Sequence, residues 1–360
     1  MDATKHMARA RAGRRGRSLT AGGAMVLLGL MSAAAAASWR DYRDKPDAWY
    51  HSEQGAGIIA NVLSWQSPQG SWPKNTDTWS KPFSGAPEKP HGTFDNSATT
   101  DELRFVARAF RATGDARCEQ AFLKGLDHIL AAQYPTGGWP QYHPPGKGYP
   151  RHITFNDGAM IRLMIFLREV ATAPDYEFVP AARRRAARDA VDRGVRCILK
   201  CQIIIDGRRT AWCAQHDELD YRPRPARTYE LVSLSGSESV GILRFLMSLD
   251  DPSPPVAAAI AAGVAWFESV HLPGMRQTTV AGDRVIVADP EGPGLWARFY
   301  EIGTNRPFFC GRDGVKKYSL AEIEAERRNG YAWYGTWPRT LPADYAAWQK
   351  KWPAAAQPAP

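Results

Sequence analysis

Two short segments of the chain each pair an aspartate with an asparagine, directly after a Thr-Phe dipeptide. Asp95 and Asn96 end the first segment, and Asn156 and Asp157 end the second. The four side chains offer carboxylate and amide oxygens, which are the ligands that Ca²⁺ prefers, whereas zinc and copper sites normally recruit His or Cys. If the two segments meet in the fold, they predict a calcium site.

Each of these residues has a simpler interpretation when it is taken alone. Asp157 stands just before a glycine and an apolar helix-like stretch, and Asn96 stands just before Ser97, so either side chain could cap a helix N-terminus. Capping explains one acid at each place, but it does not explain why the Asp/Asn pair occurs twice. The repetition therefore favours the metal site.

A second set of residues is cationic and lies among aromatic and acidic residues. Its members are Arg222, Arg224, Arg227, Arg298, Arg306 and Arg312. Because a guanidinium binds a carboxylate through two parallel hydrogen bonds, such a cluster beside a metal could bind a chain of uronic acids. The alternative is ordinary ion pairing with the nearby acids Glu218, Glu230, Glu301 and Asp313. The chain has no Gly-rich phosphate loop, no Gly-x-Ser-x-Gly and no His-Glu-x-x-His, which excludes several large enzyme classes.

The elements that must position these residues recur along the chain. Trp72, Trp139 and Trp212 each follow an apolar helix-like stretch and a glycine turn, at spacings of 67 and 73 residues. Each tryptophan is followed by a loop, a Thr-aromatic-polar triplet and a second amphipathic helix that carries a start signal. The triplets occupy residues 93–95, 154–156 and 228–230.

A unit of about 70 residues with two helices and a long loop predicts a mainly helical fold, an (α/α) toroid or barrel in which neighbouring units lean on one another. Equivalent loops of such a repeat open on one rim, so the triplets should converge. Residues 276–337 differ, because apolar and polar residues alternate there and aromatic residues are frequent. This region predicts a few short strands.

The two ends of the chain differ from the rest. Basic residues precede an apolar run from Ala21 to Met31 and a stretch of alanines, which is the pattern of a signal peptide, here residues 1–36. We therefore expect an exported protein, periplasmic or secreted, with one catalytic domain at 37–345 and an Ala/Pro-rich tail at 346–360. No later window approaches the ~20 apolar residues of a membrane span, so no membrane attachment is expected after cleavage.

The net charge limits the class of binding partner, and the cysteine content limits the possible disulfides and metal sites. The leader holds six Lys/Arg and one Asp, so its removal takes the formal charge from +9 to +4. The remaining chain has no basic run longer than the three arginines at residues 183–185, which favours an acidic polysaccharide over nucleic acid as the partner. Five cysteines allow at most two disulfides without fixing their pairing. Cys197 and Cys201 lack the second pair that a zinc site needs, so we expect buried or disulfide-bonded cysteines.

Seven motifs stand in order along the chain, at residues 70–75, 93–96, 137–141, 153–158, 226–230, 234–239 and 336–338. In these motifs the sequence resembles polysaccharide lyase family 10, the pectate lyases. The resemblance extends from about residue 49 to residue 338. It implies an (α/α) toroid with a wide cleft, bound calcium, and anti β-elimination of polygalacturonate.

Matched position by position, the resemblance implies roles for individual residues. Asp95, Asn96 and Asp157 match the site for calcium and the substrate carboxylate. Arg227 matches the proposed Brønsted base, and Arg312 matches a second arginine that binds the uronate. The expected substrate-binding residues are Lys74 and Asn96 from the motifs and Arg298, Arg306 and Arg312 from the arginine cluster.

The implied reaction explains why these residue types occur together. Removal of the C5 proton of a galacturonate unit builds negative charge on its carboxylate, which calcium and an arginine would stabilise. Expulsion of the C4 oxygen then leaves a 4,5-unsaturated oligogalacturonide, and no covalent nucleophile is needed. Because a free guanidinium has a pKa above about 12, a base at Arg227 predicts an alkaline pH optimum.

Two other functions fit part of the pattern. An inverting glycoside hydrolase would use Asp95 and Asp157 as acid and base around a water molecule, without a metal requirement. A non-catalytic polyuronate-binding protein would use the same arginines and aromatic residues without turnover. The interpretation that accounts for all the motifs is a monomeric, calcium-dependent pectate lyase with polygalacturonate as its partner.

Overall fold

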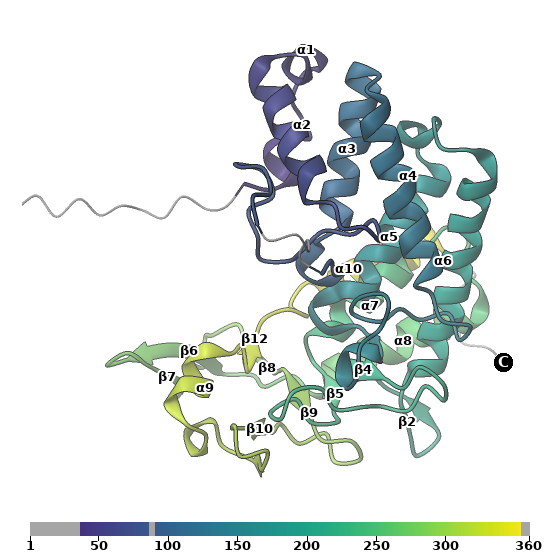
Figure 1. Cartoon of the computed structure of the whole chain (residues 1–360). Coiled ribbons are helices and arrows are strands. Elements are labelled where there is room, and N and C mark those ends of the chain that lie inside the picture. Colours follow the sequence, from purple (N-terminus) through teal and green to yellow (C-terminus); the bar gives the residue numbers. More distant parts are fainter. Residues whose placement is uncertain (1–36, 86–90, 354–360) are drawn as a thin grey trace, which may run out of the picture. The chain divides into compact units, whose positions relative to one another are not determined.

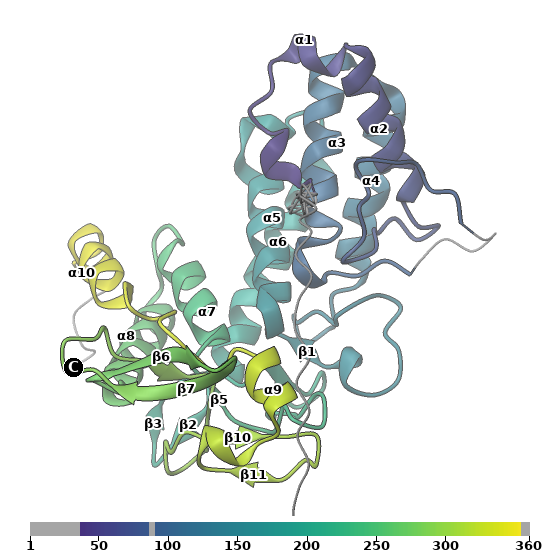
Figure 2. The same cartoon turned by 90° about the vertical axis from the view of Figure 1, so that its left-hand side faces the viewer.

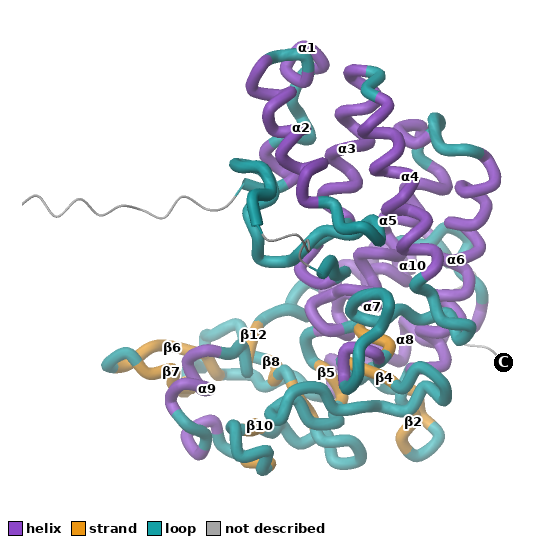
Figure 3. Tube along the Cα trace, viewed as in Figure 1, coloured by secondary structure: helices purple, strands orange, loops and turns teal. Residues whose placement is uncertain are grey.

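The computed structural model of the chain describes residues 37–85 and 91–353 (Figure 1). The predicted signal peptide, residues 1–36, and residues 354–360 of the predicted tail lie outside this range. Within it, helices dominate the regular structure, which confirms the mainly helical prediction (Figure 3). They are α1 (Asp47–Tyr50), α2 (Glu53–Trp65), α3 (Thr100–Thr113), α4 (Ala116–Ala131), α5 (Ala159–Thr172), α6 (Ala181–Cys201), α7 (Glu238–Met247), α8 (Pro254–Ser269), α9 (Ala325–Gly330) and α10 (Leu341–Lys351).

The longer helices form two layers. In one layer α2, α4, α6 and α8 pack each against the next, and in the other α3, α5, α7 and α10 do the same. The layers contact each other where consecutive helices meet, at α3 and α4, α5 and α6, and α7 and α8. Such a succession of helix pairs is the arrangement of the predicted (α/α) toroid.

Each unit of the repeat consists of a helix of the first layer, a long loop and a helix of the second layer. The units α2–α3, α4–α5 and α6–α7 are those predicted from the sequence. The structure adds a fourth unit, α8–α10, whose loop is expanded to residues 270–340 and holds most of the strands. The boundary predicted after residue 345 falls inside α10, where Trp348 is buried in the core.

The three repeated tryptophans close the units in the same way. Trp72, Trp139 and Trp212 are fully buried, and each indole N–H donates to a carbonyl oxygen of the preceding helix at 2.8 to 2.9 Å. A buried indole needs such a partner, because an unpaired polar group in the core is costly. The tryptophan thus fixes where each loop leaves its helix.

The third Thr-aromatic-polar triplet does not belong to the repeat. In the first two units the triplet's first residue donates its backbone N–H to the tryptophan carbonyl, at 3.0 and 3.1 Å. In the third unit Ser235 makes this bond to Trp212, at 2.7 Å. The assignment of residues 228–230 was therefore wrong, because a longer loop precedes the equivalent position and serine replaces threonine there.

A glutamine joins each unit to the following one, although this contact was not predicted. The Nε2 groups of Gln66, Gln133 and Gln202 each donate to a carbonyl of their own turn at 2.9 to 3.0 Å. Each also donates to a carbonyl of the next helix in the first layer, α4, α6 or α8, at 2.8 to 3.0 Å. The first layer is therefore linked by side-chain hydrogen bonds as well as by packing.

The start of α3 shows how local sequence fixes a helix end. The backbone N–H of Thr99 donates to the Glu102 carboxylate at 2.9 Å, as in the predicted capping box. The helix ends at Thr113, and the next residue, Gly114, has a left-handed φ of 70° that glycine adopts without strain. These signals place the N-terminus of α3 directly after the first Asp/Asn pair.

The strands are short and pair antiparallel in twos, and those between α8 and α10 confirm the prediction for residues 276–337. Figure 2 shows β6, β7, β10 and β11 beside α9. The pairs are β1 (Ile153–Thr154) with β4 (Gln215–His216), β2 (Ile204–Ile205) with β3 (Arg208–Arg209), β5 (Leu234–Ser235) with β9 (Phe299–Tyr300), β6 (Met275–Val280) with β7 (Asp283–Ala288), β8 (Trp296–Ala297) with β12 (Tyr334–Gly335), and β10 (Phe309–Cys310) with β11 (Lys316–Lys317).

The apolar residues form two separate clusters. The main core lies between the helix layers and includes the three repeated tryptophans. A smaller cluster, which we call the strand core, lies under the short strands and consists of Tyr229, Phe299, Phe308, Phe309, Cys310, Leu320, Ile323 and Trp333. The insertion between α8 and α10 therefore supplies most of a second core, to which Tyr229 of an earlier loop contributes, while Trp296, Ala297 and Tyr300 of the insertion belong to the main core.

All five cysteines are free thiols and are buried. Of the two expected states, buried or disulfide-bonded, the structure shows the first. Cys197 and Cys201 lie on one face of α6 with their sulfur atoms 4.0 Å apart. Burial raises the pKa of Cys118 to about 12 and that of Cys310 to about 11, so these thiols stay protonated at neutral pH.

None of the helices in residues 37–85 and 91–353 has the length and apolar character to cross a membrane.

Candidate active site

The two Asp/Asn pairs lie in adjacent turns. Each pair opens a 3₁₀ turn, Asp95–Ser97 or Asn156–Gly158, and the two turns pack against each other. The second residue of each pair has a left-handed backbone, with φ of 51° at Asn96 and 50° at Asp157. Asn and Asp tolerate this conformation better than most residues. The predicted convergence of the first two loops is confirmed.

Asp95 is the buried member of the group, with 3% of its surface exposed. Its Oδ2 accepts hydrogen bonds from Lys74 Nζ and, at 2.8 Å, from Gln141 Nε2. Its Oδ1 accepts the backbone N–H of Asn96 at 3.0 Å. Lys74, a predicted substrate-binding residue, therefore lies beside a predicted metal ligand and neutralises its charge.

Arg298 joins the second turn to the start of α7. Its Nη2 donates to Asn156 Oδ1 and Asp157 Oδ1, both at 3.4 Å, and to Glu238. Burial is the largest single effect and lowers the pKa of Arg298. The Glu238 carboxylate, together with Tyr331, Asp157 and Glu230, raises the pKa by more in total, so the net shift is upward and the guanidinium stays charged. The residue comes from the segment between β8 and β9, about 140 residues from Asp157 in the sequence.

Arg227, the predicted base, is held by a single carboxylate. Its Nε donates to Glu230 Oε2 at 2.8 Å, its Nη2 donates to Glu230 Oε1, and its side chain is 41% exposed. The hydrogen bond to Glu230 raises the pKa of Arg227, and partial burial opposes this only in part. In the structure Arg227 therefore makes the ordinary ion pair with Glu230 that was the alternative expectation.

Of the six arginines in the cluster, the structure joins two to this group. The Tyr331 ring lies 4.8 Å from Arg298 Cζ and 5.8 Å from Arg227 Cζ, and the ring therefore lies close to both. Arg306 packs over Tyr318, with its Cζ 3.7 Å from the ring centre, and exposed Arg312 pairs with Glu326 at 3.0 Å. No contact among the described residues joins these last two to the Asp/Asn turns.

The remaining arginines of the cluster make local ion pairs. Arg224 pairs with Asp217 at 2.7 Å, and Arg222 pairs with Asp220 at 3.4 Å. Neither acid was among the partners expected from the sequence. Both pairs lie in the loop that precedes Arg227 and stabilise its conformation. Arg227 is therefore the arginine of this loop that we assign to the site.

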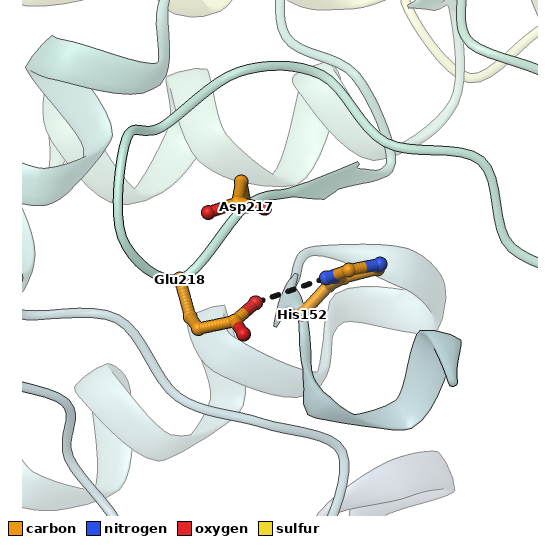
Figure 4. A group of neighbouring side chains, drawn as sticks. All are labelled: His152, Asp217 and Glu218. Atoms are coloured by element: carbon orange, nitrogen blue, oxygen red, sulfur yellow. Dashed lines mark hydrogen bonds and ion pairs between the residues drawn. The ribbon is translucent and has the colours of Figure 1, made fainter. Parts of the chain in front are cut away.

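A second group of side chains could hold a metal ion by the proximity of its atoms. His152, Asp217 and Glu218 each bring one ligand atom within 4.8 Å of the others, and His152 Nδ1 lies 3.0 Å from Glu218 Oε2 (Figure 4). The carboxylates already have cationic partners, Arg224 for Asp217 and Arg151 for Glu218. An ion there would have to displace these partners.

The oxygens at the adjacent turns fit a hard cation better. The Asp157 carboxylate is 42% exposed and meets Arg298 only at 3.4 Å, and Asn96 Oδ1 accepts no hydrogen bond from the residues that the structure describes. Asp95 adds a buried carboxylate, whose Oδ2 is paired with Lys74 and whose Oδ1 accepts the backbone N–H of Asn96. Two carboxylates and an amide, without His or Cys, form a donor set that suits Ca²⁺.

Three residues that support the predicted ones were not predicted from the sequence. Glu238 binds Arg298, Gln141 binds Asp95, and Tyr331 bridges two arginines. Glu238 had a signal, since Ser235 and Glu238 have the spacing of a capping box, but this indicated a helix start and not a buried acid. Gln141 follows the Gly-Gly-Trp-Pro motif without an acidic or cationic signal, and nothing local distinguishes Tyr331.

Glu238→Ala is expected to lower the free energy of unfolding by about 3 kcal/mol, because it leaves the buried guanidinium of Arg298 without its main partner. The side chains of Glu238 and Arg298 are 2% and 9% exposed. Chemical denaturation followed by circular dichroism measures the change. Asp44→Ala, which removes a solvent-exposed pair with Arg43, is the control and should have no measurable effect. An equally small effect of Glu238→Ala would contradict the prediction.

Comparison with known proteins gave one family and a set of solved structures. The model of a family described as pectic acid lyase matches residues 66–341. A family 10 polysaccharide lyase from Cellvibrio cellulosa is 38% identical, with a TM-score of 0.75 over 84% of this chain and 94% of that chain. An aspartate-to-alanine mutant from the same organism, in complex with trigalaturonic acid, has the same identity and TM-score over 84% of this chain and 95% of its own. The comparison with curated proteins found no match.

Proposed function

Since this chain belongs to the pectic acid lyase family, it is a polysaccharide lyase that acts on pectate, and we propose that it uses calcium and Arg227 to cleave polygalacturonate by β-elimination. The family indicated by the sequence motifs is thereby confirmed. One observation supports the detailed proposal above the others. The two Asp/Asn turns meet, and Arg298 and Tyr331 connect them to Arg227 through a continuous set of contacts.

The acidic part of the site would bind the metal and the substrate carboxylate. Asp95, Asn96 and Asp157 would hold Ca²⁺, which when bound supplies a positive charge that stabilises the carboxylate of the reacting galacturonate. Arg298 lies beside Asp157 and would bind the same carboxylate from another side. Lys74, Arg306 and Arg312 would bind the carboxylates of uronate units on either side of the reacting one.

The reaction itself requires one proton transfer at Arg227. A neutral guanidine accepts the C5 proton, the C5–H electron pair forms the C4–C5 double bond, and the C4–O bond breaks with its pair on the leaving oxygen. Arg298 would stabilise the charge that builds on the substrate carboxylate during this step. Water supplies the proton for the leaving oxygen. The solvent-exposed position of Arg227 gives substrate access to its guanidine.

The proposal also covers where the protein acts. Its substrate is an extracellular polysaccharide, and residues 1–36 have the pattern of a signal peptide. We expect the mature protein to be exported and to act as a monomer on polygalacturonate. Amino-terminal sequencing of the protein recovered after expression with its leader tests the cleavage.

The activity assay separates the proposed function from its two rivals. Purified mature protein is incubated with polygalacturonate and calcium, and ultraviolet absorbance reports the unsaturated uronide. A rise that a chelator abolishes supports the calcium-assisted lyase. Reducing ends without absorbance would indicate a hydrolase built on Asp95 and Asp157, and saturable binding without either signal would indicate a binding protein.

The rate is expected to rise as the pH increases from about 7 to about 10. Glu230 raises the pKa of Arg227, so the guanidinium is protonated across the neutral range and the neutral form becomes more populated with each unit of pH. Initial rates of absorbance change at constant ionic strength and calcium concentration give the profile. A maximum below pH 7 would rule out Arg227 as the base.

A further inference from the structure

We infer that Glu230 and Tyr331 position both arginines of the site, so that Arg227 and Arg298 act as one rigid unit. The inference rests on the proposed function and extends it, because neither residue is among the predicted catalytic or binding residues. It is carried by the contacts of the two side chains, which come from distant parts of the sequence.

Both carboxylate oxygens of Glu230 accept two hydrogen bonds each, and those from Arg227 fix the plane of its guanidinium group. Its Oε2 accepts the Nε–H and, at 3.1 Å, the backbone N–H of Arg227, while Oε1 accepts Nη2 of the same guanidinium. The carboxylate is buried, with 5% exposed. Nη1 is the nitrogen of Arg227 that has no hydrogen-bond partner in the described part of the chain. The bidentate contact therefore decides which nitrogen remains for a substrate.

Tyr331 touches every member of this unit. Its hydroxyl donates to Glu230 Oε1 at 2.8 Å, and its ring lies near the guanidinium groups of both Arg298 and Arg227. The ring itself is held by Trp333, whose centroid is 4.9 Å away at a steep angle. A cation over an aromatic face is attracted to it, more strongly where water is excluded. A shift of Tyr331 would therefore move both arginines.

The charges around Arg227 determine how the loss of Glu230 would act. The Tyr229 ring lies 5.0 Å from Arg227 Cζ, and Arg327 lies over the same ring at 4.7 Å. With Tyr331 and Glu230, these are the titratable groups of the described residues that interact with Arg227, and Arg298 lies near the same Tyr331 ring. Glu230 is the anion among them, so its replacement by glutamine would leave Arg227 among cations that favour a neutral guanidine.

Two effects of Glu230→Gln are therefore expected. Loss of the two-point contact with Arg227 should lower kcat by about 100-fold at the optimum, because the base is no longer oriented. Loss of the negative charge should also move the rising limb of the pH profile to lower pH by about one unit. A residue with a purely structural role would lower the activity at all pH values without moving this limb.

The test compares Glu230→Gln, Tyr331→Phe and Glu169→Gln with the wild type. Tyr331→Phe removes the hydroxyl and keeps the ring, so we expect about a 10-fold lower kcat with little change in KM. Glu169 pairs with Arg104 in the same bidentate manner, at 2.8 and 2.9 Å between α3 and α5, and its replacement should leave kcat and the pH profile unchanged.

The measurements are kcat and KM on polygalacturonate as functions of pH, with melting temperatures to check folding. An active wild type with an unmoved pH limb in Glu230→Gln and an unchanged kcat in Tyr331→Phe would overturn the inference and leave the proposed function intact. If Glu230→Gln does not fold, an unchanged kcat in Tyr331→Phe alone overturns it. A wild type that yields no unsaturated product would refute the proposed function and the inference with it.

Discussion

Arg227→Ala is expected to lower kcat for polygalacturonate cleavage by about 1,000-fold while KM changes little. The guanidine accepts the C5 proton, and removal of a positioned general base costs about 100- to 10,000-fold in rate. Binding should persist, because the other cations and the Asp/Asn turns that are expected to bind the substrate remain. Initial rates of ultraviolet absorbance increase, measured across a range of substrate concentrations, give both constants.

Arg224→Ala provides a matched control for this experiment. Arg224 lies three residues earlier in the same loop, pairs with Asp217 at 2.7 Å, and has a side-chain exposure of 45% against 41% for Arg227. It should leave kcat near the wild-type value. Equal losses in both variants would mean that the loop as a whole, and not the base, was disrupted. Full activity of Arg227→Ala would refute the proposed base.

Removal of calcium is expected to abolish turnover, and Asp157→Ala should raise the calcium concentration for half-maximal activity by about 100-fold. Asp157 is the more exposed of the two carboxylates and is only weakly engaged by Arg298, whereas Asp95 is already paired with Lys74. Loss of a charged ligand weakens a calcium site strongly, since affinity depends on the number of charged oxygens. Activity is measured in chelator-buffered calcium solutions, beside calorimetric titration with calcium alone.

Two outcomes would contradict the calcium prediction. The first is a wild type that keeps its activity in excess chelator. The second is an Asp157→Ala variant with an unchanged calcium requirement, which would place the metal elsewhere, with His152, Asp217 and Glu218 as the next group to test. Asp192→Ala on α6 removes an exposed carboxylate and should alter neither measurement.

Local patterns predicted the frame of the protein well. Apolar periodicity, capping boxes and the Trp turns identify units whose helices contact their neighbours in the chain, and Trp72 and Trp139 indeed close equivalent loops. The Asp/Asn pairs were predictable for the same reason, because their turns are built from consecutive residues. The fourth unit escaped prediction because residues 270–340 separate its two helices.

The charged contacts of the site could not be predicted in this way. Arg298 reaches Glu238 across 60 residues and Asp157 across 141, and no short motif records such distances. The six arginines looked alike in sequence, yet burial and partner choice separate Arg298 and Arg227 from the others. The error at residues 228–230 has a related cause, since threonine and serine make the same backbone contact and loop length decides which residue makes it.

The separate strand core has a consequence for how the protein loses function on heating. Arg298 and Tyr331 belong to the inserted segment, whereas Asp95 and Asp157 belong to the helical frame. A segment with its own small core can open as a cooperative unit at lower free energy than the whole domain. Amide hydrogen exchange should then be faster in β10 and β11 than in α3 and α5, and thermal inactivation should precede the loss of helical signal.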